Sequence, residues 1–201
     1  MNDRCPVSEW PQALALAIGE YEAGRTASAR EALLQLVGAH PNEGAPLRAL
    51  GAVLCNEGNF EDAIPVLEQA ATADPGDSAT KAYLAMALLL GRQDVVGAQE
   101  RIREAVAQAP GSFVVRWKHG ELLLRLGYAR EAAAELQAAL QADAPDAASR
   151  THCADMLRVA ERRAEGQVNR VAPSFPPQVL RDLFSGMRSL RFLGHPARRE
   201  V

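Results

Sequence analysis

The sequence has few aromatic residues, few cysteines and no surplus of positive charge. Phe, Trp and Tyr make up 5% of the 201 residues, so a core has to rest on Ala, Leu and Val. Ala and Leu are the strongest helix formers, which favours packed helices. The net charge of −3 gives no reason to expect binding to nucleic acid. The three Cys residues have no metal-ligand spacing, so we expect reduced thiols in a cytoplasmic protein.

Long apolar runs are also missing. No run approaches the roughly 20 residues that a membrane span needs, and residues 1–11 lack the apolar stretch of a signal peptide. We therefore expect neither a membrane protein nor a secreted one.

The chain instead repeats itself about every 34 residues, a period typical of stacked two-helix units. Four ladders of proline or small residues keep this period: Pro41, Pro75, Pro110 and Pro145; Gly24, Gly58, Gly91 and Gly127; Ala29, Ala63, Ala98 and Ala132; and Ala17, Gly51, Ala85 and Gly120.

Each ladder has a physical role. Gly58 and Gly127 fall between two helical patterns, where a tight turn needs a residue that enters the left-handed region. Pro75 and Pro110 follow the second helix of a unit, which proline cannot continue. Small residues are expected where the two helices of one unit cross, at Gly51, Ala63, Gly120 and Ala132.

The segment 44–75, which contains the stretch LRALGAVLCNEGNFEDAIPVLEQAATADP at 47–75, resembles a tetratricopeptide repeat throughout its length. The positions that match the family pattern in order are Leu50, Gly51, Gly58, Phe60, Ala63, Leu67, Ala70 and Pro75. A later segment matches at Gly120, Gly127, Tyr128, Ala132, Leu136 and Ala139. The resemblance, to repeat proteins of the bacterial type, implies an all-α, right-handed superhelical solenoid. Residues 10–165 would hold four repeats and a C-terminal cap helix at 147–165.

In this family the first helix of each repeat lines the concave side of the solenoid. The positions that would face inward are Leu14, Ile18 and Tyr21 in the first unit; Arg48, Ala52, Cys55 and Asn56 in the second; Ala79, Ala82, Met86 and Leu89 in the third; and Val114, Trp117, Glu121 and Leu124 in the fourth. This mainly apolar set predicts a groove for an apolar or amphipathic segment. Packing in the core is the alternative for Ala79, Leu89 and Val114, and it is equally favoured for Trp117.

The resemblance also bears on the partner. Some family members clamp a chaperone's C-terminal carboxylate with Lys and Asn, but none of the matching positions here holds either residue: Leu14, Ile18, Ala49, Ala79 and Tyr83. An adaptor or chaperone-like scaffold, similar to bacterial secretion chaperones, is the favoured function. A purely structural assembly scaffold is the second hypothesis, and self-association stays open.

Beyond the repeats, residues 166–178 contain Pro173, Pro176 and Pro177 and are predicted to be a linker. Residues 179–201 contain a short basic amphipathic helix with the apolar stripe Leu180, Leu183, Phe184, Met187 and Leu190. Residues 167–201 carry six Arg against two acidic residues, a net charge of +4. This helix could pack on the last repeat, fill the protein's own groove or recruit a partner, and membrane-surface binding is less favoured.

The stretch PPQVLRDLFSGM in this region resembles the junction in repeat proteins fused to a methyltransferase domain. The likeness covers about a dozen positions, and no Gly-rich nucleotide loop follows. A regulatory or truncated relative of such fusions is therefore an alternative.

No catalytic constellation is present in the sequence. His152 and Cys153 are adjacent on a predicted helix, where they point about 100° apart and cannot easily share a metal. Acidic residues follow the spacing of solvated helix faces. We therefore expect a binding protein without cofactor or metal, and not an enzyme.

Overall fold

The computed structural model describes residues 10–144 and 146–165. Within these ranges the chain forms nine α-helices and no β-strand. The helices are α1 (Trp10–Glu22), α2 (Thr26–Ala39), α3 (Gly44–Glu57), α4 (Phe60–Ala73), α5 (Ser78–Gly91), α6 (Val95–Gln108), α7 (Phe113–Arg125), α8 (Ala129–Leu140) and α9 (Ala147–Ala164). The first eight pack in consecutive pairs as four helical hairpins, which confirms the predicted all-α solenoid.

The turns inside the hairpins follow the glycine ladder at three of its four positions. Gly24, Gly58 and Gly127 have φ angles of +79°, +83° and +90°, a conformation that only glycine adopts without strain. In the third hairpin the residue with positive φ is Gln93, at 56°. Gly91 ends α5 instead, where an added Cβ would lie 3.2 Å from Cβ of Phe60. Gly91 therefore keeps the period but serves close packing rather than the turn.

The small residues predicted at the helix crossings are confirmed. A Cβ on Gly51 would come within 2.4 Å of Leu67 Cδ2, and one on Gly120 within 2.6 Å of Leu136 Cγ. Both leucines are fully buried, so each glycine admits a large side chain from the second helix of its own unit.

Ion pairs between units show which side of each first helix faces its neighbours. Arg48 of α3 lies 3.0 Å from the carboxylate of Asp77, at the start of the next unit. Glu57, on another side of α3, lies 2.7 Å from Arg30 of the preceding unit. Asp77 also caps α5, because its side chain accepts a hydrogen bond from the Ala79 amide.

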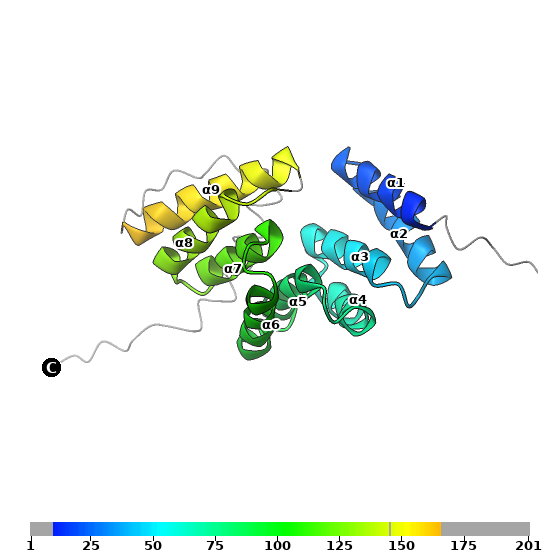
Figure 1. The fold of residues 1–201 in the computed structure, drawn as a ribbon, viewed down its shortest axis with the longest axis horizontal. Coiled ribbons are helices and arrows are strands. Elements are labelled where there is room, and N and C mark those ends of the chain that lie inside the picture. Colours follow the sequence, from blue (N-terminus) through cyan, green and yellow to red (C-terminus); the bar gives the residue numbers. More distant parts are fainter. Residues whose placement is uncertain (1–9, 145, 166–201) are drawn as a thin grey trace, which may run out of the picture.

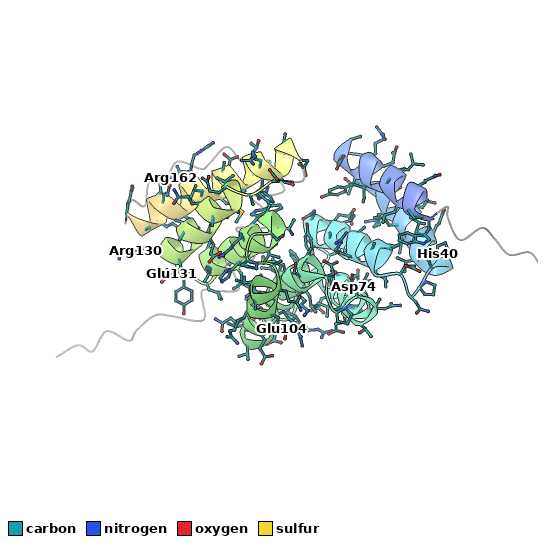
Figure 2. The ribbon with its side chains drawn as sticks, viewed as in Figure 1. His40, Asp74, Glu104, Arg130, Glu131 and Arg162 are labelled. Atoms are coloured by element: carbon teal, nitrogen blue, oxygen red, sulfur yellow. The ribbon has the colours of Figure 1, made fainter. Side chains whose placement is uncertain are left out.

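The units stack into an arc (Figure 1). Helices α1, α3, α5, α7 and α9 follow its inner side, and α4, α6 and α8 lie on its outer side. Charged side chains such as Glu104 of α6 and Arg130 and Glu131 of α8 point away from the arc (Figure 2).

Helix α9 closes the end of the arc opposite α1 (Figure 1). Its buried residues Cys153, Met156 and Ala160 join a second core cluster with α7 and α8, while the main cluster runs from α1 to α7. Within the described residues, no helix combines the length and apolar character required to cross a membrane. Pro145, the predicted linker 166–178 and the basic helix in 179–201 lie outside the described residues.

Candidate functional site

A series of polar and aromatic contacts crosses the inner side of the arc and joins each first helix to the next. From α3, the exposed Asn56 donates a hydrogen bond from Nδ2 to the Tyr21 hydroxyl of α1, at 2.7 Å. The buried Cys55 thiol lies 3.9 Å from the backbone oxygen of Tyr83 in α5. The first three units are therefore joined by side chains from the inward positions of their first helices.

The same series of contacts continues through α7 to α9. The Lys118 ammonium lies 5.2 Å from the ring centroid of Tyr83 and 4.2 Å from that of Trp117, so it makes cation–π contacts with both rings. Trp117 meets His152 of α9 edge-on, with centroids 5.4 Å apart, and its Nε1 donates to Met156 Sδ at 3.4 Å. We call these residues, with Glu121 and Arg125, the polar seam.

The centre of the polar seam is a buried cluster of three charges on α7. Glu121 lies 3.1 Å from the Lys118 ammonium and 2.8 Å from the Arg125 guanidinium, at i,i+3 and i,i+4 spacing. Burial by itself would raise the pKa of Glu121, but the charges of Lys118 and Arg125 outweigh it and hold the pKa well below its usual range. Burial would likewise lower the pKa of Lys118, yet Glu121 raises it above the ordinary value. The cluster therefore stays fully charged near neutral pH.

Neutral groups surround this cluster. Burial lowers the pKa of His152, so its imidazole is uncharged near neutral pH. Burial raises the pKa of the Cys55 thiol to about 12 and that of Cys153 to about 11, and both thiols are free. Neither cysteine is therefore suited to act as a nucleophile. The described part of the chain holds no group of three or more His, Cys, Asp or Glu residues that could bind a metal.

The residues predicted to line the groove divide into two sets. Most of the apolar ones are buried between helices and offer almost no surface to a ligand: Leu14, Cys55, Ala82, Met86, Leu89, Trp117 and Leu124. Glu121 is also buried. Those that keep exposed surface are Ile18, Tyr21, Arg48, Ala52, Asn56, Ala79 and Val114. The accessible part of the predicted set is thus more polar than the whole set, and Trp117 and Leu89 belong to the core.

Exposure at equivalent repeat positions is higher in the first two units than in the last two. The position after the small crossing residue holds Ile18, Ala52, Met86 and Glu121 in the four units. Ile18 is 39% exposed, whereas Met86 and Glu121 are 2% and 8% exposed. Ile18, Tyr21, Ala52 and Asn56 therefore form one accessible surface on the first two units, which we call the α1–α3 patch.

Sequence reasoning did not place four members of the polar seam on the inner side: Lys118, Arg125, His152 and Met156. It considered Tyr83 only as a position that matches the carboxylate clamp. A signal existed for two of them, because Lys118 and Arg125 flank Glu121 at the spacings that allow helical ion pairs. Their burial could not be predicted, because it depends on how close α5 and α9 come to α7.

Comparison with known proteins agrees with this architecture. Residues 14–78 match a family model described as tetratricopeptide repeat. No curated protein sequence matches the chain.

Solved structures with the same arrangement of helices share little sequence with this chain. A thermophilic tetratricopeptide protein from Thermus thermophilus, TTC0263, has a TM-score of 0.63 at 17% identity, over 89% of this chain and 99% of that one. A chain of the APC/C hetero-tetramer Cut9–Hcn1 has a TM-score of 0.68 at 18% identity, and this chain (82% covered) spans only 32% of it. MamA (41-end) from Desulfovibrio magneticus RS-1 gives 0.52 at 16% identity, over 94% and 98% of the two chains.

Identities this low show a shared fold and nothing finer. The family match falls on the first two hairpins, and the ladder of small residues carries the same architecture through the other two. Residues 14–78 therefore match the tetratricopeptide repeat family, and the helices that follow continue the same fold up to α8.

Proposed function

We propose that the protein is an interaction module that holds an apolar or amphipathic segment of another protein against the α1–α3 patch. The observation that carries this proposal is the exposure of Ile18 beside Tyr21 and Asn56, on the side of the arc lined by the first helices. An apolar side chain of the ligand would cover Ile18 and Ala52, and the Asn56 amide would offer a hydrogen bond at the edge.

The polar seam supports this role by fixing the shape of the surface. The hydrogen bond between Asn56 and Tyr21 holds an aromatic ring in one orientation, so little side-chain entropy is lost on binding. The Lys118 ammonium, paired with Glu121, lies over the Tyr83 ring of α5 and so links α7 to the preceding unit. A rigid inner face without a reactive thiol or metal group in the described residues suits an adaptor or chaperone-like scaffold better than a catalyst.

Charge favours the protein's own basic segment as a second occupant of the α1–α3 patch. Residues 10–109 carry seven basic and thirteen acidic side chains, a net charge of −6, whereas residues 167–201 carry +4. The protein's own basic segment would therefore be attracted to the half of the solenoid that holds the α1–α3 patch. In this version the segment competes with the partner. Buried free thiols at Cys55 and Cys153 suit a reducing compartment such as the cytoplasm.

Selection from a displayed library of random peptides tests the proposal, together with affinity purification from the native cell. Bound peptides should be enriched in apolar residues at helical spacing. Ile18→Asp should weaken their binding at least about tenfold, because a charge would be buried under the ligand. The control is Leu34→Asp on α2, where the side chain is 54% exposed, and it should leave affinity unchanged.

Two results would contradict the proposal: no enrichment of apolar peptides, or enriched peptides whose affinity is the same for Ile18→Asp and the unaltered protein. A synthetic peptide of residues 179–201 added in trans distinguishes the second occupant. If it displaces the selected peptides, the protein's own segment shares their site.

A further inference from the structure

One side of α1 occupies a position that is covered in the second and third units. Contacts identify this side: in α3 it carries Glu57, which pairs with Arg30 of the preceding hairpin. In α5 it carries Gly91, which packs within 3.2 Å of Phe60 of the preceding hairpin, measured from an added Cβ. The side that faces the preceding unit is therefore known from two independent junctions.

Residues at i, i+4, i+7 and i+11 lie on the same side of a helix, so these contacts define a stripe of four residues on each first helix. The stripe consists of Pro46, Leu50, Val53 and Glu57 in α3, and of Thr80, Leu84, Ala87 and Gly91 in α5. The first three residues of each stripe are buried. The equivalent stripe of α1, which we call the α1 outer stripe, is Gln12, Leu16, Gly19 and Ala23, and all four are exposed. Leu16 is 73% exposed, whereas its equivalent Leu50 is 2% exposed.

The α1 outer stripe has no charged residue and changes in size along the helix. Gln12 and Leu16 are large, and Gly19 and Ala23 are small. A Cβ built on Gly19 would meet nothing within 4 Å, so the space above this glycine is open. Elsewhere the chain fills such a space with leucine, as Leu67 does over Gly51 and Leu136 over Gly120.

We propose that the α1 outer stripe binds the same stripe of a second copy, with the two α1 helices antiparallel about a two-fold axis. An axis midway between Leu16 and Gly19 places Leu16 of each copy over Gly19 of the other. The same axis places Gln12 over Ala23, so every large residue of the stripe meets a small one. This self-complementarity is what an isologous interface requires.

The charges of α1 agree with this arrangement. Its acidic residues Glu20 and Glu22 would lie opposite Ala15 and Ala13 of the second copy, so no like charges meet. Head-to-tail stacking onto α9 of another copy is disfavoured, because α9 exposes the charged residues Arg158 and Glu161 at that end of the solenoid. A contact between two single helices is small, so we expect weak, reversible association.

Sedimentation velocity on the full chain, from about 5 to 500 µM, tests this pairing. The weight-average mass of the unaltered protein should rise from monomer toward dimer across the range. Leu16→Glu should keep it monomeric throughout, because two charges would be buried at the axis. The matched control is Val96→Glu on α6, whose side chain is 71% exposed, and it should associate like the unaltered protein.

Gly19→Leu is the second variant, in case Leu16→Glu perturbs folding. It fills the acceptor space on an exposed helix face where an added Cβ meets nothing within 4 Å, so circular dichroism should be unchanged while association is lost. A protein that stays monomeric at the highest concentration overturns the proposal. A dimer that survives both substitutions overturns it too, because its interface then lies elsewhere. Both outcomes are independent of peptide binding to the α1–α3 patch.

Discussion

The first and fourth units place the same repeat positions in opposite environments. Ile18 and Glu121 are equivalent, yet Ile18 is exposed on α1 and Glu121 is buried on α7 between two cations. The first three units together are also acidic, because residues 10–109 carry −6, whereas residues 110–165, the fourth unit with α9, carry eight basic and eight acidic side chains. The fourth unit is covered by α9 on one side, and no described helix precedes the first unit. One end of the solenoid is thus packed more fully than the other.

The largest expected effect is the loss of the buried carboxylate. Glu121→Ala removes the ion pair of the buried Lys118 ammonium, so we expect the free energy of unfolding to fall by about 3–5 kcal/mol. Ile18→Ala, at the equivalent position of the first unit, should cost less than about 1 kcal/mol. Urea unfolding followed by circular dichroism measures both. Glu131→Ala, at an exposed position of α8, is the control. Equal losses for Glu121→Ala and Ile18→Ala would break the comparison.

Smaller changes in the free energy of unfolding are expected at two glycines, and the two changes have opposite signs. Gly51→Ala forces Leu67 to move, because the new Cβ would lie 2.4 Å from it, and should cost about 1–3 kcal/mol. Gly19→Ala meets open space on an exposed helix and should stabilise the protein by up to about 1 kcal/mol. Thermal unfolding at low protein concentration separates the two changes from any self-association. A destabilising Gly19→Ala would show that α1 is already covered in the monomer.

The smallest expected effect is the change with pH in the stability that Glu121 contributes. The folded state lowers the pKa of Glu121 below its ordinary value of 4.5, so this carboxylate adds stability above about pH 4.5 and loses that contribution as the pH falls toward the lowered pKa. The stability gap between the unaltered protein and Glu121→Gln should therefore be widest near neutral pH and shrink in acid. Urea unfolding at a series of pH values measures the gap. A gap that stays constant into strong acid would mean that Glu121 is not the titrating group.

The helices, their crossings and their turns were largely predictable from the sequence. Gly51 and Gly120 mark helix crossings, because a residue without a side chain leaves room there for a leucine of the second helix. Gly58 and Gly127 mark turns, because glycine adopts their positive φ without strain. The third unit shows the limit of such ladders. Gly91 keeps the period, yet Gln93 takes the left-handed conformation. Ala85 and Ala98 lie 13 positions apart, whereas Gly51 and Ala63 lie 12 apart, so the third unit has one extra residue that shifts its turn. Spacing alone does not assign one role to every glycine.

The candidate site was less predictable. The repeat register placed Trp117, Met86 and Leu124 on the inward side of their helices, but it could not give the depth at which each side chain lies. Depth depends on how closely the next helix approaches, and α9 and α5 cover α7 more fully than α3 covers α1. Lys118 illustrates the same point, because a lysine is expected at the surface until Glu121 and two aromatic rings are known to surround it.

The sequence by itself determined the repeat, since period, turn glycines and crossing residues act within one unit and need no distant partner. Only the tertiary structure decided which of four equivalent positions is buried. Leu16 and Leu50 occupy the same place in their repeats, yet one is exposed and the other lies in the core. The difference comes from neighbours stacked on each unit, and a solenoid gives its first unit a neighbour on one side only.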